Sequence, residues 1–252
     1  MDSRPIGVFD SGTGGISLLR NLTALMPEEN FIYYGDDKNA PYGTRSEEEI
    51  LSLARADVRF LMGFDVKAVV IACNTATSAA AKTLRSELTI PVIGIEPALK
   101  PAETERTEGV IAVLATPATL RQSKFEELMR LYGAHAVKLP CPGLMEFAEK
   151  GVTEGEELDA FLRETFRPLQ GQNVTGAVLG CTHYVFMKQA ISKALPGVKL
   201  YDGNDGTARQ LRRVLREKGL QAPAGEGSVR YFSSSESAEQ INVMKRLMAM
   251  PI

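Results

Sequence analysis

The chain has 252 residues, a length that fits one large domain or two small ones. A hydrophobic fraction of 44%, a charged fraction of 24% and a net charge of −2 without a basic stripe indicate a globular protein that binds neither nucleic acid nor an anionic membrane. With no signal-peptide-like start, no apolar run near the roughly 20 residues of a membrane span and only three cysteines, we expect a cytoplasmic protein with reduced thiols.

Short apolar segments alternate with segments of helical periodicity along the whole chain. The predicted strands cover 5–9, 30–36, 66–72, 91–96, 109–116, 135–140, 176–180, 198–203 and 228–234. The predicted helices cover 16–26, 46–62, 77–88, 117–132, 142–150, 155–168, 209–219 and 237–250. Ser46 followed by Glu49 is a capping-box pattern and predicts where the second helix begins.

This alternation predicts an α/β fold of mainly parallel sheets with helices on both faces. In such folds ligands bind beyond the carboxyl ends of the strands. The segment 112–119 (AVLATPAT) weakly repeats 7–15 (GVFDSGTGG), since in both an apolar strand runs into small hydroxyl residues. We infer two similar α/β halves that each contribute one strand-end loop and one strand-end cysteine to a shared cleft.

Two of the cysteines, Cys73 and Cys181, end apolar strands and are followed by small polar residues. A free cysteine is usually an inert, buried apolar residue. Where a strand passes into a helix, however, the helix N-terminus lowers a thiol pKa below its ordinary value of about 8.5. Cys141 lacks the polar followers, and we interpret it as structural.

His183 lies two positions from Cys181 and is suited to exchange a proton with that thiol near neutral pH, whereas His135 has no such neighbour. Zinc ligation by Cys73, Cys181 and His183 has little support, because no CxxC, HxxxH or HExxH spacing is present. The segment 202–206 (DGNDG) does not match a calcium loop and is predicted to be a turn.

The glycine-rich stretch after the first strand, 10–15 (DSGTGG), lacks the lysine of a phosphate-binding loop. Its glycines predict a tight turn with free backbone N–H groups. Asp10 in such a turn is suited to orient a base or to bind a substrate ammonium group. The Pro41-Tyr42-Gly43 loop follows the second strand at the same edge of the sheet.

Taken together, five segments resemble the glutamate racemases, a family of cofactor-independent amino-acid racemases. These segments are GVFDSGTGG (7–15), YYGDDKNAPYGTRS (33–46), ACNTAT (72–77), LATPAT (114–119) and GCTHY (180–184). They occur in the family's order over most of the chain. Thr77 and Val185 depart from the family's usual Ser and Pro, which affects loop geometry and neither thiol.

The resemblance implies racemisation of glutamate by two bases without a cofactor or a metal, to supply D-glutamate for bacterial peptidoglycan. Cys73 would take the Cα proton of D-glutamate and Cys181 that of L-glutamate, with Asp10 assisting Cys73 and His183 assisting Cys181. Glu149 would support the site as a further carboxylate. The substrate would be bound by Asp10, Ser11, Tyr42, Gly43, Asn74, Thr75, Thr116, Thr119, Thr182 and His183.

In the family two domains enclose the substrate, and we expect them to cover 1–96 plus 207–252 and 97–206. A homodimer is common in the family and is expected here. Three other functions stay open. These are a related racemase acting on another acid, a cysteine hydrolase using Cys181 and His183, and a non-catalytic protein that binds an amino acid or anion.

Overall fold

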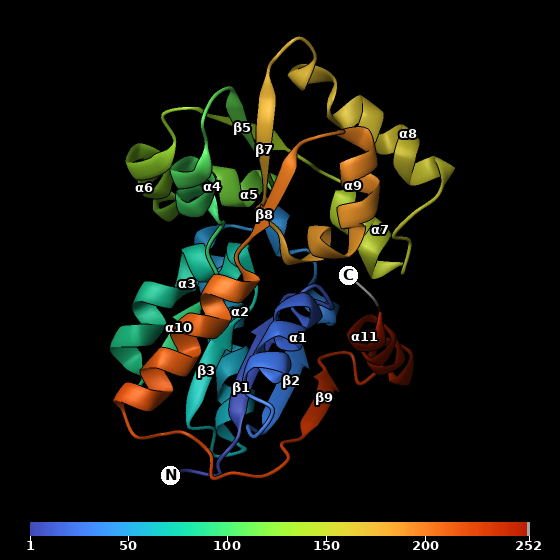
Figure 1. Ribbon diagram of the computed structural model, residues 1–252. Helices are drawn as coiled ribbons and strands as arrows, with labels where there is room; N and C mark the ends of the chain where they lie inside the picture. Colours follow the sequence, from blue (N-terminus) through green and yellow to red (C-terminus); the bar gives the residue numbers. More distant parts are fainter. Residues whose placement is uncertain (251–252) are drawn as a thin grey trace.

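The computed structural model describes residues 1–250. They form two separate β-sheets, one in the lower and one in the upper part of the molecule in Figure 1. The first sheet has the strand order β4-β3-β1-β2-β9 and the second the order β6-β5-β7-β8. Every neighbouring pair of strands in both sheets is parallel. The predicted α/β fold with mainly parallel sheets is therefore confirmed.

The strands are β1 (Ile6–Asp10), β2 (Phe31–Gly35), β3 (Ala68–Ile71), β4 (Val92–Gly94), β5 (Val110–Ala115), β6 (Ala136–Pro140), β7 (Val174–Leu179), β8 (Lys199–Asp202) and β9 (Val229–Ser233). The α-helices are α1 (Ile16–Leu25), α2 (Glu47–Met62), α3 (Asn74–Glu87), α4 (Leu99–Glu105), α5 (Pro117–Arg121), α6 (Ser123–Tyr132), α7 (Leu144–Glu149), α8 (Glu156–Thr165), α9 (Lys188–Ala194), α10 (Asn204–Glu217) and α11 (Ala238–Ala249). We refer to the first sheet with α1, α2, α3, α10 and α11 as the first lobe, and to the second sheet with α4 to α9 as the second lobe.

The two sheets share one arrangement. β2-β1-β3-β4 of the first lobe corresponds to β6-β5-β7-β8 of the second, so that β1 matches β5 and β3 matches β7. Asp10 is thus the last residue of β1, and Thr116 directly follows the equivalent strand β5. Cys73 and Cys181 likewise follow the equivalent strands β3 and β7. This correspondence agrees with the weak sequence repeat. The domain boundaries at 96/97 and 206/207 stay a prediction.

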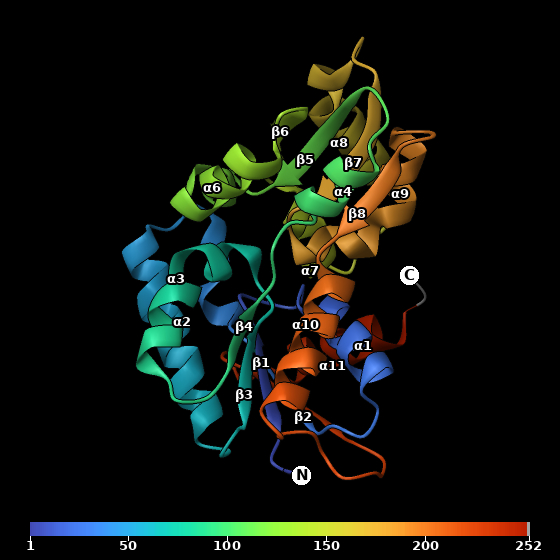
Figure 2. The ribbon, with the colours of Figure 1, turned by 60° about the vertical axis from the view of Figure 1, so that its left-hand side comes forward.

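Helices cover both faces of each sheet, which explains why the central strands are apolar on both sides. In the first lobe α1, α10 and α11 pack on one face and α2 and α3 on the other (Figure 2). In the second lobe α4 and α6 cover one face and α7, α8 and α9 the other. β1 and β3 are buried along their whole length.

The predicted capping box is present, since Ser46 and Glu49 exchange hydrogen bonds at the start of α2. The predicted helix over 117–132 is interrupted at Gln122, whose backbone is extended. The turn predicted over 202–206 is wrong in part, because α10 already begins at Asn204. Asp202 accepts a hydrogen bond from the Asn204 backbone N–H (2.9 Å), which satisfies one of the free donors at that helix start.

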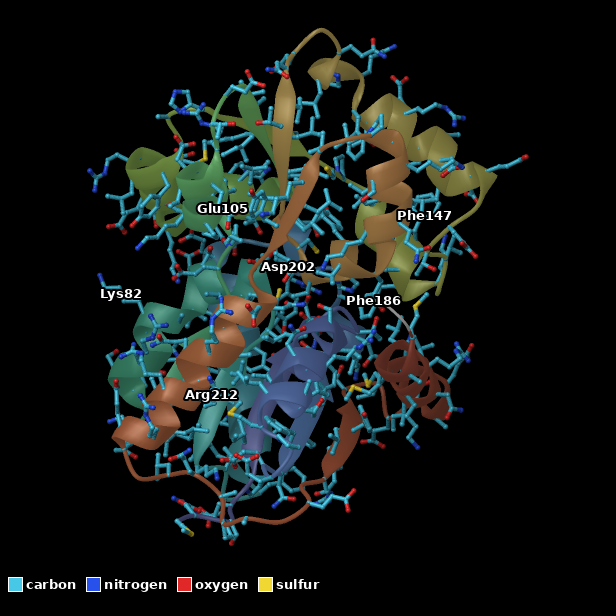
Figure 3. The ribbon with its side chains drawn as sticks, in the orientation of Figure 1. Lys82, Glu105, Phe147, Phe186, Asp202 and Arg212 are labelled. Atoms are coloured by element: carbon cyan, nitrogen blue, oxygen red, sulfur yellow. The ribbon has the colours of Figure 1, made fainter. Side chains whose placement is uncertain are left out.

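The lobes are joined by the chain between β4 and α4 and again between β8 and α10 (Figures 1 and 2). A third connection is made by packing. Phe186, from the segment after β7, is buried in the core formed by β1, β2, α1 and α10 of the first lobe. Figure 3 shows Phe186 and Asp202 at the level where the two lobes meet.

Candidate active site

A small cavity lies between the lobes, at the carboxyl ends of strands from both sheets. Its lining combines two thiols with hydroxyl, amide and imidazole groups and one thioether. The lining residues are Ser11, Tyr42, Gly43, Cys73, Asn74, Thr75, Thr116, Met145, Gly180, Cys181, Thr182 and His183. Its volume of about 10 Å³ is close to the room that one water molecule needs.

The thiol of Cys73 caps the N-terminus of α3. Its Sγ accepts the backbone N–H of Ala76 (3.4 Å) and lies 3.4 Å from the Ser11 hydroxyl. Burial raises the pKa of Cys73 to about 12, the charge of Asp10 adds to this, and the two hydrogen bonds oppose it. The helix N-terminus predicted from the sequence is present, but burial outweighs its effect, and Cys73 is a thiol at neutral pH.

The second thiol has a different environment. Cys181 is followed by a 3₁₀ helix, Thr182–Met187, and its Sγ caps no backbone N–H there. Instead, Sγ lies 3.6 Å from Nδ1 of His183. Cys181 therefore does lie where a strand passes into a helix, but the helix is a 3₁₀ helix and its N-terminus gives the thiol no hydrogen bond, because the chain tightens after β7.

His183 is held on its other side by Glu149, from the end of α7. Nε2 of His183 lies 2.5 Å from Oε1 of Glu149, which also accepts the backbone N–H of Thr13 (3.0 Å). Burial lowers the pKa of His183, but Glu149 and Cys181 outweigh it, so the net pKa is well above the ordinary value. The imidazolium in turn keeps the pKa of Glu149 below its usual range despite burial.

Asp10 is fully buried behind the cavity. Its carboxylate accepts the backbone N–H of Gly12 (2.9 Å) and the hydroxyl of Thr182 (3.2 Å). Burial raises the pKa of Asp10, the charge of His183 opposes this and the charge of Glu149 adds to it. Asp10 thus links the first lobe to the Cys181 loop of the second.

Two glycines of the turn after β1 allow this close approach. A Cβ at Gly12 would lie 2.3 Å from Oε1 of Glu149, and a Cβ at Gly14 would lie 2.4 Å from Nδ1 of His183. Real side chains do not tolerate such contacts. The glycines predicted to free backbone donors are therefore also needed to let His183 and Glu149 reach the turn.

Three threonines from both lobes form one buried hydroxyl cluster. The Oγ1 atoms of Thr75, Thr116 and Thr119 lie 3.0–3.2 Å from one another. Thr75 and Thr116 line the cavity, whereas Thr119 lies behind them. The hydroxyl of Tyr42 faces Asp36 and Asp57, so that only the rest of Tyr42 is available to the cavity.

The structure gathers ten of the predicted residues around the cavity and places Asp10, Thr119 and Glu149 behind its wall. Met145 and Gly180 also line it and were not predicted. Met145 carried no signal, since it reads as a core residue of an amphipathic helix. Neither Cys141 nor His135 lines the cavity, since Cys141 is buried in the second core and His135 pairs with Glu103 at the surface.

No lysine or arginine is among the described residues that line the cavity. Within residues 1–250, no group of three or more His, Cys, Asp or Glu side chains is arranged to hold a metal ion. In the same part of the chain, no helix is both long and apolar enough to cross a bilayer. The thiols and the imidazole that line the cavity are suited to proton transfer, and its hydroxyl and amide groups are neutral hydrogen-bond donors for an anion.

These groups define an acid–base enzyme of the α/β class. Residues 7–211 match the model of the Asp/Glu/Hydantoin racemase family. The chain is 48% identical to the glutamate racemase of Clostridium perfringens and 47% identical to that of Clostridium novyi, in each case over 98% of this chain and 97% of the relative. The chain therefore belongs to the Asp/Glu/Hydantoin racemase family and is an isomerase.

Solved structures agree with this assignment. A glutamate racemase isoform of Bacillus anthracis superposes with a TM-score of 0.90 at 31% identity, covering 100% of this chain and 96% of the other. The Francisella tularensis glutamate racemase, solved in complex with D-glutamate, superposes with a TM-score of 0.85 at 29% identity, covering 100% and 96%.

Proposed function

We propose that this protein interconverts L- and D-glutamate by a two-base proton transfer at Cα, in which one of Cys73 and Cys181 removes a proton and the other adds its own. The observation that carries the proposal is that two thiols from equivalent strands of two similar sheets line the same small cavity. One base cannot easily serve both faces of Cα, whereas two groups on opposite walls can. The names of the relatives indicate glutamate as the substrate.

In the reaction a thiolate on one face takes the proton from Cα, and the electron pair of the broken C–H bond stays on carbon. The thiol on the other face then gives its proton to the same carbon, which inverts the configuration. Following the family pattern, Cys73 takes the Cα proton of D-glutamate, and Cys181 takes the Cα proton of L-glutamate. His183, kept protonated by Glu149, is placed to exchange a proton with Cys181.

The substrate carboxylates would be held by neutral donors. Ser11, Thr75 and Thr116 line the cavity and carry hydroxyls, and the backbone N–H groups at the start of α3 add to them. Thr182 also lines the cavity, with its hydroxyl donated to Asp10. Asn74 lines the cavity with its Oδ1 buried and without a partner among the described residues. This oxygen is suited to accept a hydrogen bond from the substrate ammonium group.

A cavity of about 10 Å³ cannot admit a whole glutamate. We therefore propose that the lobes separate to let the substrate in and close around it for the reaction. Closure would remove water from the carbanion, which strengthens every electrostatic contact with it. The product would supply D-glutamate for peptidoglycan in the cytoplasm, and a homodimer stays a prediction.

The test is incubation of the purified protein with D- or L-glutamate in D2O, followed by proton NMR of the Cα signal and chiral analysis. We expect loss of the signal together with the opposite enantiomer. Cys73→Ser and Cys181→Ser should each abolish racemisation. Retention of the Cα proton by both enantiomers would contradict the proposal.

One rival function has an observation in its favour, because the contact between Cys181 and His183 also suits a cysteine hydrolase. A hydrolase would not need Cys73. Full activity of Cys73→Ser on a thioester or amide substrate, with no racemisation by the wild-type protein, would favour this rival.

A further inference from the structure

The loop that carries Tyr42 and Gly43 is anchored by a buried hydrogen-bonded triad outside the cavity. The Tyr42 hydroxyl oxygen lies 2.6 Å from Oδ2 of Asp36 and 3.0 Å from Oδ2 of Asp57. The exposed fractions of Tyr42, Asp36 and Asp57 are only 1%, 1% and 2%. Asp57 comes from the buried face of α2, where Ile50, Ala54, Val58 and Leu61 form the core.

A count of hydrogens favours one extra proton in this triad. A tyrosine hydroxyl has a single hydrogen and can donate to only one of the two carboxyl groups. The other carboxyl must itself be protonated and donate to the Tyr42 oxygen, since two buried acceptors at these distances would otherwise face each other. In residues 1–250 neither Asp36 nor Asp57 forms an ion pair that could balance a second charge.

The surroundings indicate that the extra proton is on Asp57. Asp36 already accepts hydrogen bonds from the Asn39 amide (2.9 and 3.1 Å) as well as the short one from Tyr42, a pattern that suits a carboxylate. Asp57 has Tyr42 as its only hydrogen-bond partner among the described residues.

The titratable groups that face Asp57 are Tyr42 from the loop, Asp36 and Tyr34 from β2 and its end, and Asp10 from β1. The two carboxylates among them favour the neutral form of Asp57. Burial raises the pKa of Asp57 to about 8, the charges of Asp36 and Asp10 add to this, and the hydrogen bond with Tyr42 opposes it.

The loop links this triad to the substrate cavity. Tyr42 and Gly43 line the cavity and begin a 3₁₀ helix, Tyr42–Thr44, so that their N–H groups have no partner within the helix. Gly43 also packs against Thr116 of the second lobe, since a Cβ added at Gly43 would lie 3.3 Å from the Cβ of Thr116.

We propose that Asp57 is a positioning residue, whose carboxyl proton fixes the Tyr42 hydroxyl and thereby places the N–H groups of Tyr42 and Gly43 against a substrate carboxylate. The role in substrate binding rests on the proposed racemase function, whereas the proton on Asp57 does not. Loss of this proton would leave two carboxylates facing one hydroxyl and would release the loop. Glutamate binding should therefore weaken as the pH rises past the pKa of Asp57.

The proton is tested first, without reference to activity. Protein labelled with ¹³C at the aspartate carboxyl carbons is titrated from pH 4 to pH 10 by NMR. We expect one carboxyl signal to titrate near pH 8 in the wild-type protein and in the control Glu48→Gln, an exposed residue on the same helix. This signal should be missing in Asp57→Asn. Completion of every aspartate titration below pH 6 would overturn the proposal.

The positioning role is tested by the KM and kcat for glutamate at pH 7 and pH 9. In Asp57→Asn the neutral amide can donate to the Tyr42 oxygen, so we expect a KM near the wild-type value at pH 7 and no rise at pH 9. The wild-type KM should rise about tenfold, the effect of losing one hydrogen bond to a charged group. Asp57→Ala should show the raised KM at both pH values, with a smaller change in kcat.

A KM of Asp57→Asn that rises with pH as in the wild-type protein would overturn the positioning role. If Asp57→Ala does not fold, the NMR titration still tests the proton on Asp57, and the KM of Asp57→Asn still tests the positioning role. If the wild-type protein does not racemise glutamate at all, the proposed function fails, and the NMR titration alone decides whether Asp57 holds the proton.

Discussion

The imidazole of His183 and the carboxylate of Glu149 form a close pair, with Nε2 of His183 2.5 Å from Oε1 of Glu149. The pair connects a cysteine of one lobe to the glycine turn of the other, because Glu149 also accepts the Thr13 N–H and His183 contacts Cys181. The protonation of the second thiol, the position of the first strand-end turn and the closure of the lobes are therefore expected to depend on one another.

Replacement of Glu149 by Gln should lower the pKa of His183 towards its ordinary value of about 6.5, because the charge that supports the imidazolium is lost while the burial that opposes it stays. We expect the charged form of His183 to persist to higher pH in the wild-type protein than in the variant. ¹⁵N NMR of the histidine ring measures this directly, with His135 as the internal control. An unchanged His183 titration would contradict the assigned pairing.

The same pair should make stability depend on pH. The pKa of His183 is raised on folding, so its contribution is complete below about pH 6.5 and is lost as the pH rises through the folded-state pKa. Glu149→Gln should therefore reduce the free energy of unfolding by about 2 kcal/mol at pH 6 and by less once the pH has passed the folded-state pKa of His183. Urea titrations at pH values below and above the His183 pKa measured by NMR check this, and an equal loss at both would assign the effect to packing alone.

Gly14→Ala should displace His183 from Cys181, since the new methyl group would lie 2.4 Å from the imidazole Nδ1. A misplacement of about 1 Å at a catalytic group can cost about 100-fold in rate, and we expect a loss of this order in kcat/KM. Gly206→Ala is the matched control, because a Cβ there meets nothing within 4 Å and α10 tolerates alanine. Similar activity of both variants would show that His183 does not need this position.

The thiol of Cys73 should titrate at unusually high pH. In a Cys141→Ser/Cys181→Ser background, the alkylation rate of Cys73 should still rise about tenfold per pH unit at pH 9, because burial raises its pKa to about 12. Asp10→Asn in this background should shift the profile to lower pH, since a neighbouring negative charge is removed. A plateau near pH 8.5 in the parent would contradict the assigned environment.

The strand ends could be predicted from the sequence because apolar strands, a glycine-rich turn and strand-end cysteines are local patterns, and parallel strands bring their carboxyl ends to one edge. The partners of these residues depend on packing between distant helices. Met145 and Glu149 reach the site only because α7 lies across the lobe boundary. The one available signal for the triad was Asp57, an acidic residue at a core position of an amphipathic helix.

Replacing Lys67, which pairs with Glu29, tests whether stability can be changed separately from activity. They form an ion pair with side-chain exposed fractions of 0% and 1%, and Lys67 also donates to the backbone oxygen of Asp2 (2.6 Å). Lys67 precedes β3, at the opposite end of that strand from Cys73. Lys67→Met would leave a buried carboxylate without its partner, which costs about 3–5 kcal/mol of unfolding free energy.

We expect Lys67→Met to unfold at a lower temperature and a lower urea concentration while its KM for glutamate stays unchanged below the transition. Lys82→Met is the matched control, because Lys82 is exposed on α3 and projects away from the protein (Figure 3). Adding Glu29→Leu to Lys67→Met should restore part of the stability, since the unpaired charge is then removed. If the double variant is no more stable than Lys67→Met, the loss of stability comes from the hydrogen bond to Asp2 and from packing, and not from the unpaired charge of Glu29.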